Sequence, residues 1–257
     1  MILTIDIGNS VITVGTVSRA GIHFVEQIST DLRKTDLEYA VAFRTILDLY
    51  KIPSRPLNGS ILSSVVPPLT PTINRALAKI TRTPALVVGP GVKTGLSIRI
   101  DHPEQLGSDL VVNAVAALAE YPLPLVVIDM GTATTFSVLD AEGNYRGGSI
   151  LPGVRISLDS LVSHTAQLPR ISFEAPTRTI AKNTVDSMKC GIVYGSAAMV
   201  DGMLDRMEEE MGQPLGAVAT GAAAPSIIPH CRHKIQYDET LPLKGLYRIY
   251  LKNRTVH

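Results

Sequence analysis

Two segments of the sequence share one pattern of residues that suits anion binding. In each, an apolar run leads into Asp-x-Gly and a second apolar run follows, with Asp6 and Gly8 in the first and Asp129 and Gly131 in the second. Glycine lets backbone N–H groups approach an anion without a Cβ atom in the way, and aspartate can hold a metal ion or its hydration shell near phosphates. A single copy would read as a plain tight turn. Two copies, one in each half of the chain, favour a clamp for the phosphates of ATP.

Polar side chains beside these turns would complete such a site. Asn9, Ser10, Thr132 and Thr134 follow the two Asp-x-Gly segments and offer hydrogen-bond donors. A third segment, residues 217–225, suits a close approach of the backbone to an adenine ring, or an ordinary turn from strand to helix. The sequence contains neither a complete P-loop motif nor a complete G-x-G-x-x-G motif that would bind a nucleotide elsewhere.

Phosphoryl transfer also needs a carboxylate that orients the acceptor hydroxyl. Asp109 is the candidate, because it lies where a loop is expected to become a helix, a common position for functional groups. The same position suits a helix cap, which Ser108 or Asp109 could form. On spacing alone, the catalytic and the capping interpretations both stay open.

The elements that would position these residues alternate between strands and helices, which indicates an α/β protein. Apolar β-formers and turn residues predict one meander of strands over residues 1–30 and another over 121–153. Between and after them the pattern predicts short strands within 59–68, 85–90 and 214–225, and helices at 36–51, around 73–80, and at 107–121, 183–211 and 241–253. The repeated Asp-x-Gly segments predict two similar lobes, divided near residues 121–124, with both turns facing one cleft.

Composition excludes several classes of protein. Of 257 residues 45% are hydrophobic, and 24 Lys and Arg balance 23 Asp and Glu to a net charge of +1, which argues against a nucleic-acid or membrane-surface binder. Mean hydropathy is +0.21, but the apolar runs are too short to span a membrane, and no signal peptide is expected. Two cysteines predict no disulfide framework and fit a cytoplasmic protein.

Two further motifs have structural interpretations. Gly191 and Gly195 are four residues apart on a predicted helix, which permits close helix packing and favours a dimer interface. Residues 230–233, His-Cys-Arg-His, lack the ligand spacing of a zinc site, so no metal is expected on that segment.

Several segments, in their order along the chain, resemble those of the type III pantothenate kinases, which belong to the superfamily of acetate and sugar kinases, heat-shock chaperones and actin. The strings that carry the resemblance are TIDIGNS, GSDLVVNAVAAL, VVIDMGTATTFSVLD, GGSILPG, IAKNTVDSMKCGIVYG and ATGAAAP. The resemblance implies two duplicated actin-like (ribonuclease H-like) lobes, residues 1–121 and 122–257, with mixed sheets flanked by helices and a nucleotide cleft between them.

The resemblance also implies an activity, the ATP-dependent phosphorylation of pantothenate to 4'-phosphopantothenate, the first step of coenzyme A biosynthesis. Asp109 would take the proton of the primary hydroxyl, and Asp129 would bind a monovalent cation, K⁺ or NH₄⁺. ATP with Mg²⁺ would be bound by Asp6, Ile7, Gly8, Asn9, Ser10, Val11, Ile12, Thr13 and Thr132. The acceptor would contact Ile100, Gly107, Ser108, Asp109, Leu110 and Thr184, with Thr184 reaching across from the partner subunit of a homodimer.

The sequence departs from the family's pattern at the acceptor and at the adenosine segment. Leu110 stands where the family usually has the Arg of Gly-x-Asp-Arg, Ile100 stands where it usually has Tyr, and Ala222 replaces a second glycine. Arginine is the natural bidentate partner of the pantothenate carboxylate, which leucine cannot replace. Two alternatives therefore stay open: a kinase of another small hydroxyl-bearing acceptor, and a non-catalytic nucleotide-binding paralogue or regulator.

Overall fold

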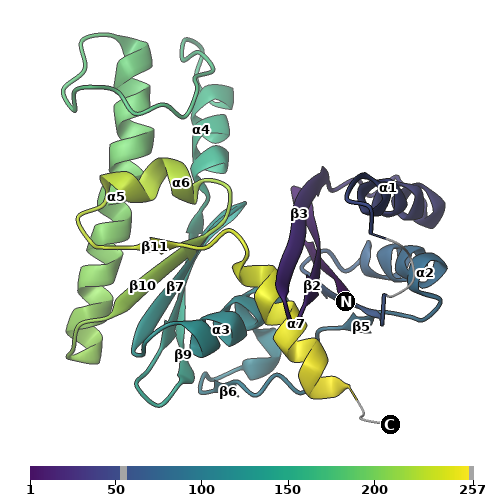
Figure 1. Cartoon of the computed structure of the whole chain (residues 1–257). Helices are drawn as coiled ribbons and strands as arrows, with labels where there is room; N and C mark the ends of the chain where they lie inside the picture. The colour runs from purple at the N-terminus through teal and green to yellow at the C-terminus, as the bar shows by residue number, and fades with distance from the viewer. Residues whose placement is uncertain (53–56, 255–257) are drawn as a thin grey trace. The chain divides into compact units, whose positions relative to one another are not determined.

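The computed structural model describes residues 1–52 and 57–254 (Figure 1). These residues form two compact units. Unit 1 contains Met1–Leu96, Asp101–Ala119 and the segment from Thr240 onward, and unit 2 contains Ser97–Ile100 and Glu120–Glu239. Each unit has its own mixed sheet and its own core, and each is described separately below.

The sheet of unit 1 begins with the meander that the sequence predicts, β1 (Ile2–Ile7), β2 (Val11–Ser18) and β3 (Gly21–Ser29). After α1 (Asp36–Leu49), β4 (Ser60–Ser64) pairs parallel to β1, and after α2 (Thr70–Thr81), β5 (Leu86–Val87) pairs parallel to β4. The resulting order is β3-β2-β1-β4-β5. The helices α3 (Ser108–Glu120) and α7 (Leu241–Asn253) and a short 3₁₀ turn at Pro103–Gln105 complete the elements of this unit.

The sheet of unit 2 repeats this order. Its meander is β7 (Leu125–Met130), β8 (Ala133–Leu139) and β9 (Asn144–Pro152), and β10 (Gly216–Thr220) and β11 (Gln236–Tyr237) follow β7 in parallel. The order β11-β10-β7-β8-β9-β6 therefore matches that of unit 1, apart from one added edge strand, β6 (Ser97–Ile98). The repeated topology confirms the duplicated α/β lobes with mixed sheets that the sequence predicts.

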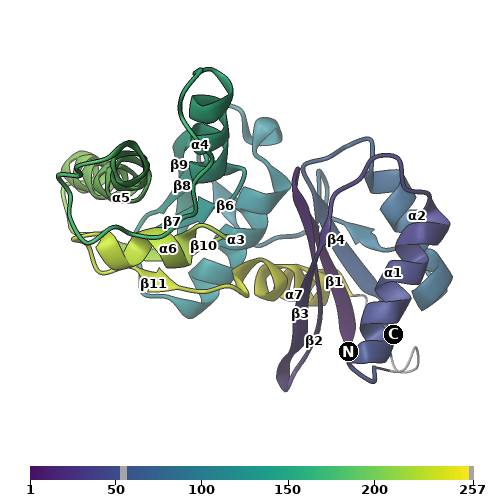
Figure 2. The ribbon, with the colours of Figure 1, turned by 90° about the horizontal axis from the view of Figure 1, so that it is seen from above.

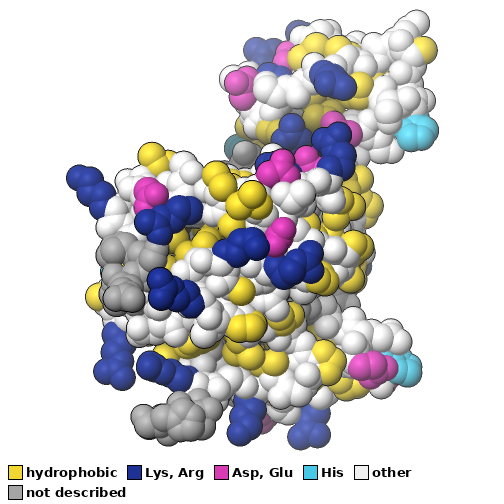
Figure 3. All heavy atoms as spheres, turned by 90° about the vertical axis from the view of Figure 1, so that its right-hand side faces the viewer, with side chains coloured by type: hydrophobic (Ala, Val, Ile, Leu, Met, Phe, Trp, Pro, Cys, Tyr) yellow, Lys and Arg dark blue, Asp and Glu magenta, His cyan; other side chains and the backbone are white. Residues whose placement is uncertain are grey.

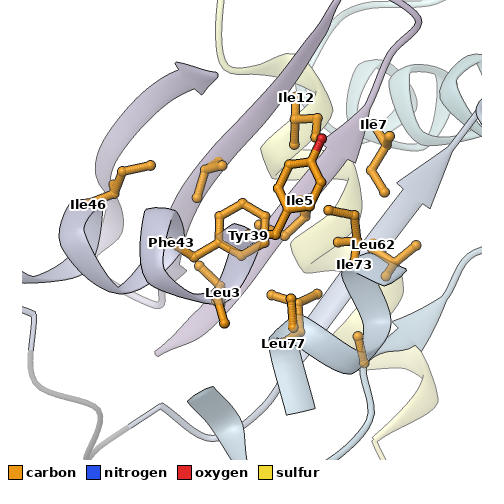
Figure 4. Close-up of a cluster of buried hydrophobic side chains, with 14 of the residues drawn as sticks. Leu3, Ile5, Ile7, Ile12, Tyr39, Phe43, Ile46, Leu62, Ile73 and Leu77 are labelled. Carbon is orange, nitrogen blue, oxygen red and sulfur yellow. The ribbon is translucent and has the colours of Figure 1, made fainter. Parts of the chain in front are cut away.

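The core of unit 1 forms where one face of the sheet meets α1 and α2. Alternate residues of β1 point to this face, as a strand's period of two requires, and all are essentially buried: Leu3, Ile5 and Ile7. Tyr39 and Phe43, one helical turn apart, come from α1 to cover them (Figure 4). Figure 2 shows α1 and α2 side by side on that face of the sheet.

Helix α7 belongs to unit 1, although it is the last element of the chain. It packs against β1, β2 and β4. The side-chain amide of Asn253 accepts the N–H of Lys93 with its oxygen and donates to the carbonyl of Lys93 with its nitrogen. A division at residue 121 would assign this helix to the second lobe. The contact-based units differ from that division here and at Ser97–Ile100, because α7 and β6 each pack on the sheet of the other half of the sequence.

Two glycines allow the close approach of α7. A Cβ atom at Gly245 would lie 2.0 Å from the carbonyl oxygen of Val112 in α3, and one at Gly15 would lie 2.4 Å from a methyl group of Leu243. The first neighbour is backbone and cannot move aside cheaply. Helix α7 therefore has no room for a larger residue at 245.

We predict that Gly245→Ala lowers the free energy of unfolding by about 1–3 kcal/mol, the usual cost of overpacking. The matched control is Gly202→Ala in the middle of a helix, where only the flexible end of Arg206 comes within 4 Å of the added Cβ. There the lost backbone freedom of glycine should dominate, with a gain of about 0.5–1 kcal/mol. Urea unfolding of both variants measures this difference, and equal effects would contradict the packing argument.

The second half of unit 2 is helical. A short helix α4 (Val154–Ser163), which the sequence pattern did not indicate, follows β9 directly, and the long helix α5 (Thr184–Met211) follows after a connecting segment. The short helix α6 (Ala224–Ile227) and a 3₁₀ turn at Ile228–His230 come after β10. Their apolar side chains form a second core with β7, β8 and β10.

Charged side chains are mixed by sign on the surface of unit 1. On the face in Figure 3, Lys and Arg side chains are interspersed with hydrophobic and acidic ones. In unit 1, two basic residues pair with acids of α1, Lys79 with Asp36 at 3.0 Å and Arg44 with Asp48 at 3.0 Å. Within the described residues, none of the helices combines the length and the apolarity that a membrane crossing requires.

Candidate functional site

The turn between β1 and β2 is held in place by the end of β3. Within the turn, the N–H of Gly8 donates to the carbonyl of Val11 at 3.0 Å. From outside it, the Thr30 hydroxyl donates to the carbonyl of Gly8 at 2.7 Å, and the Thr30 N–H donates to the carbonyl of Ser10 at 3.1 Å. Asn9 lies exposed at the tip. The first Asp-x-Gly segment is therefore a braced hairpin turn with its polar tip in solvent.

A hydroxyl cluster joins the start of α3 to the sheet edge where this turn begins. Ser108 Oγ accepts the N–H of Ser64 at 3.1 Å, donates to its carbonyl at 3.1 Å, and lies 2.9 Å from Ser63 Oγ. Ser63 is the register partner of Asp6 in the parallel pair β1–β4. The cluster therefore fixes the first turn of α3 beside the carboxyl ends of β1 and β4, the usual location of ligand sites in α/β sheets.

The contacts of this cluster exclude Ser108 as the cap of α3. The Ser108 hydroxyl is used by β4 and does not cap its own helix. The first backbone hydrogen bond of the helix runs from the N–H of Val111 to the carbonyl of Gly107 at 3.2 Å. Gly107 therefore occupies the position before the helix, and Asp109 lies within the first turn.

The carboxyl group of Asp109 has a raised pKa. Burial is the main cause, and the backbone N–H groups of Leu110 and of Asp109 itself, which lower the pKa, offset only part of it. None of the charged groups among the described residues contributes to the shift. This carboxylate is largely desolvated and lies near the carboxyl ends of β1 and β4, which gives it the properties of a general base. Its contacts with backbone N–H groups also stabilise the start of the helix.

The second Asp-x-Gly segment forms the same kind of turn in unit 2. Asp129 precedes the last residue of β7 and is paired in register with Thr135 of β8 and Thr220 of β10. The N–H of Gly131 donates to the carbonyl of Ala133 at 3.0 Å, which closes the turn. Both predicted turns therefore lie at the carboxyl end of the central strand of their own sheet.

Two other glycines pack against this second turn. The N–H of Gly153 donates to the carbonyl of Thr132 at 3.1 Å, and a Cβ atom on Gly153 would lie 2.3 Å from that oxygen. Gly221 has a φ of +92°, and a Cβ atom there would lie 2.8 Å from Asp129 Oδ1. The segments GGSILPG and ATGAAAP therefore converge on the Asp129 turn, and only glycine leaves open the space beside its carboxylate.

The threonines of this turn do not all face outward. Thr132 is partly exposed at the tip. Thr134 is completely buried in β8, and its hydroxyl has no hydrogen-bond partner among the described residues. The expectation that Thr134 offers a donor to phosphates is therefore wrong, because the alternation of β8 turns this side chain into the core.

The remaining predicted residues lie on both units. Leu110 follows Asp109 in the first turn of α3. Ile100 lies shortly after β6, and its Cγ2 atom would be 3.9 Å from a Cβ atom added to Gly147 of β9. Thr184 is the first residue of α5, exposed, after Asn183, whose side chain accepts the N–H of Asp186 at 2.9 Å. Neither Ile100 nor Thr184 belongs to the same unit as Asp109.

Sequence reasoning missed three residues of the unit 1 site: Thr30, Ser63 and Ser64. The two serines follow the apolar run of β4 directly, and polar residues at the end of a parallel strand are the signal that could have indicated them. Thr30 gave no local signal, because its role depends on a hydrogen bond to Gly8, 22 residues away in sequence.

A family model and two curated relatives identify the same family. Residues 2–206 match the type III pantothenate kinase family. The chain is 41% identical over 257 residues to a type III pantothenate kinase of Brevibacillus brevis, covering 99% of this chain and 100% of the relative. It is 40% identical over 254 residues to another of that name from an Exiguobacterium species, covering 99% and 100%.

A solved structure shares the fold at low sequence identity. The activator of the 2-hydroxyisocaproyl-CoA dehydratase from Clostridium difficile, with bound ADPNP, superposes with a TM-score of 0.55 at 10% identity, covering 99% of this chain and 98% of the other. The chain therefore shares the fold of that protein, and its own fold is a duplicated α/β arrangement with mixed sheets. The chain belongs to the type III pantothenate kinase family, whose members are ATP-dependent kinases of coenzyme A biosynthesis.

Proposed function

We propose that this chain phosphorylates pantothenate with ATP, the reaction for which its family is named, and that Asp109 is the general base. The observation that carries this assignment is the link from Ser108 to Ser63 and Ser64. That link holds a partly buried carboxylate with a raised pKa at the sheet edge where the Asp6 turn begins.

The proposed step needs little from the protein beyond position and charge. The Asp109 carboxylate accepts the proton of the primary hydroxyl, and the hydroxyl oxygen forms a bond to the γ-phosphorus of ATP as the bond to ADP breaks. A base whose pKa lies closer to neutrality than that of an exposed aspartate holds the transferred proton better. The fixed start of α3 limits the motion of this base.

The two braced turns are the proposed phosphate sites, each through the backbone N–H groups and side chains around its glycine. Gly8, Asn9 and Ser10 serve on unit 1, and Thr132 serves on unit 2. Helix α4 begins directly after Gly153, so the positive end of its dipole lies beside the Thr132 turn and favours bound phosphate.

The donor atoms at Asp129 fit hard cations, which is the class of Mg²⁺ and K⁺. Its carboxylate, with carbonyl oxygens of the same turn nearby, borders space that only glycine at 221 leaves open. We propose that Asp129 holds the monovalent cation, K⁺ or NH₄⁺, beside phosphates that carry Mg²⁺. Such cations would neutralise charge on the transferring phosphoryl group.

The acceptor is tested by a coupled assay of ADP release. The wild-type protein is given ATP with Mg²⁺ and either pantothenate or a panel of small primary alcohols with and without a carboxylate. ADP release that requires pantothenate supports the proposal. Release only with an uncharged alcohol supports the alternative that Leu110 suggests, a kinase of another hydroxyl acceptor. Nucleotide binding without release from any acceptor supports the non-catalytic alternative.

A homodimer is also part of the proposal, formed through a stripe of small exposed residues on α5. Thr184, Ser187, Gly191, Gly195 and Ala198 recur at helical spacing along one exposed side. A Cβ atom on Gly191 or on Gly195 would meet nothing within 4 Å in its own chain. A stripe of this kind lets a second helix approach closely, and it would bring Thr184 to the partner.

We predict that Gly195→Glu shifts the dimer towards monomer, because a charge in the middle of the stripe would be buried without a partner. Sedimentation velocity at several concentrations measures the shift. The control is Gln213→Glu, which adds the same charge at an exposed position outside the stripe. A monomeric wild type, or a Gly195→Glu variant that dimerises like the control, would refute the interface.

We further infer a cytoplasmic location. Cys190 and Cys231 are both free thiols, as in proteins of reducing compartments. ATP, the proposed phosphoryl donor, is a cytoplasmic metabolite.

A further inference from the structure

Three metal-ligating side chains of unit 2 converge beside the second half of α5. Asp205 and Glu208 come from one side of that helix, and His233 comes from the loop before β11. One oxygen or nitrogen atom from each lies within 4.8 Å of the other two. His233 Nε2 is 3.4 Å from Asp205 Oδ1 and 3.9 Å from Glu208 Oε2. None of these residues belongs to the proposed phosphate or acceptor sites.

The imidazole of His233 is oriented by a fourth residue, the buried Asp201. Its carboxylate accepts the backbone N–H groups of Arg232 at 2.8 Å and His233 at 3.1 Å, and lies 3.1 Å from His233 Nδ1. A carboxylate can only accept, so the ring proton is on Nδ1 and the Nε2 atom faces Asp205 and Glu208. A carboxylate behind the far nitrogen of a histidine is the usual support of a metal-bound imidazole.

A shared cation would join the three facing atoms. A neutral ring would direct the lone pair of Nε2 at two carboxylates. The Nε2 atom lies 3.4 and 3.9 Å from the two carboxylate oxygens, longer than the 2.7–3.2 Å between donor and acceptor atoms that is typical of a hydrogen bond. A tetrahedral ion with bonds of about 2.1 Å separates its ligand atoms by about 3.4 Å. The 3.4 Å between His233 Nε2 and Asp205 Oδ1 matches that separation, and all three ligand atoms lie within 4.8 Å of one another.

The second oxygen of Glu208 is already used. Glu208 Oε1 accepts the N–H of Leu215 at 2.9 Å, across the connection from α5 to β10. This contact fixes the carboxylate and leaves Oε2 directed at the histidine. Two of the three ligands are therefore held by contacts that lie outside the set itself, one through Leu215 and one through Asp201.

We propose that Asp205, Glu208 and His233 bind a divalent transition-metal ion of the zinc class, with water at the exposed fourth position. One nitrogen and two carboxylate oxygens are a ligand set that zinc accepts. The ion would join α5 to the loop that leads into β11. It would act on stability, since no residue of the set is placed in the phosphoryl-transfer machinery.

The test is a Zn²⁺ titration of the full-length chain, free of any histidine tag and of nucleotide, by calorimetry and by melting temperature. We expect one ion per chain and a rise in the melting temperature. His233→Gln and Asp205→Asn should each weaken binding by more than the 10–100-fold that is typical for loss of an outer-shell partner. Asp201→Asn should fall within that range. Glu209→Gln, an exposed neighbour on α5, is the matched control and should bind like the wild type.

Two results would overturn the proposal. Zn²⁺ binding that is equally strong in the wild type and in both ligand variants would assign the ion to another part of the chain. A melting temperature that does not respond to Zn²⁺, with no heat of binding in the titration, would mean that the cluster holds no metal ion. Because neither readout uses ATP or pantothenate, failure here is distinguishable from failure of the proposed kinase activity.

Discussion

Replacement of Asp109 by Asn is expected to lower turnover by about 10²–10⁴-fold, the usual contribution of a general base, while ATP binds as before. The amide keeps the size of the side chain but cannot take the proton of the acceptor. For the wild type, kcat should fall as the pH is lowered. The midpoint of this fall should lie above the pKa of an exposed aspartate, because burial raises the pKa of Asp109. A coupled assay of ADP release measures turnover, and calorimetry with an ATP analogue measures binding.

The same substitution is expected to stabilise the protein at neutral pH. Folding buries the carboxyl group, so the pKa of Asp109 is higher in the folded chain than in the unfolded chain. Its contribution to stability is complete below the unfolded pKa, about 3.9, and is lost as the pH rises through the folded value. At pH 7 the ionised carboxylate therefore opposes folding, and the uncharged Asn removes this effect. The gain in melting temperature should shrink as the pH approaches about 4.

The pairing of lost turnover with gained stability separates the two interpretations of Asp109. A residue kept for capping would lose about 1 kcal/mol of stability on replacement by Ala but little on replacement by Asn, which caps as well as Asp, and would leave turnover largely unchanged. An Ala variant that is less stable, together with an Asn variant that retains more than about a third of the wild-type rate, would identify Asp109 as a cap. The contrast variant is Asp6→Asn, where ATP binding should weaken, because Asp6 leads into a proposed phosphate turn.

The fold was predictable from local pattern to an unusual extent, because the chain repeats itself. Each Asp-x-Gly turn follows a strand with a nearly continuous apolar run, and β1 and β7 are both buried on both faces. The meanders and the long helix α5 carry strong periodic signals. The short elements β6 and β11, of two residues each, carry none, because a pair of residues has no period.

The candidate site was only partly predictable, because its support is non-local. Sequence pattern indicated Asp6, Asp109 and Asp129, which stand at strand or helix ends with their own turn signals. It gave no indication that Ser108 bonds across 44 residues to Ser64. Such contacts depend on which strands become neighbours in the sheet. The same limit applies to His233, whose partners on α5 lie far from the His-Cys-Arg-His segment in sequence, although that segment alone lacks metal-site spacing.

Leu110→Arg together with Ile100→Tyr is expected to tighten pantothenate binding by roughly 10–150-fold. An Arg at position 110 would add a charge-assisted hydrogen bond to the carboxylate of pantothenate, which contributes about 1.5–3 kcal/mol. Each change of about 1.4 kcal/mol in binding free energy changes the dissociation constant about tenfold. A Tyr at position 100 would add a hydroxyl donor. Both positions are partly exposed in this chain, so the larger side chains have room beside the start of α3 and after β6.

The double variant distinguishes three states of the acceptor site when the apparent affinity for pantothenate is measured beside the wild type. Improvement by a decade or more means that the pocket binds pantothenate but lacks its anchors. No change, with good wild-type activity, means that another cation already holds the carboxylate, and the exposed Arg99 and Arg155 are the candidates. Inactivity of both proteins with pantothenate, alongside intact ATP binding, would leave Asp109 and the two turns serving a different acceptor. The uncharged Leu110 predicts that such an acceptor lacks a carboxylate, because a buried anion beside leucine would have no partner.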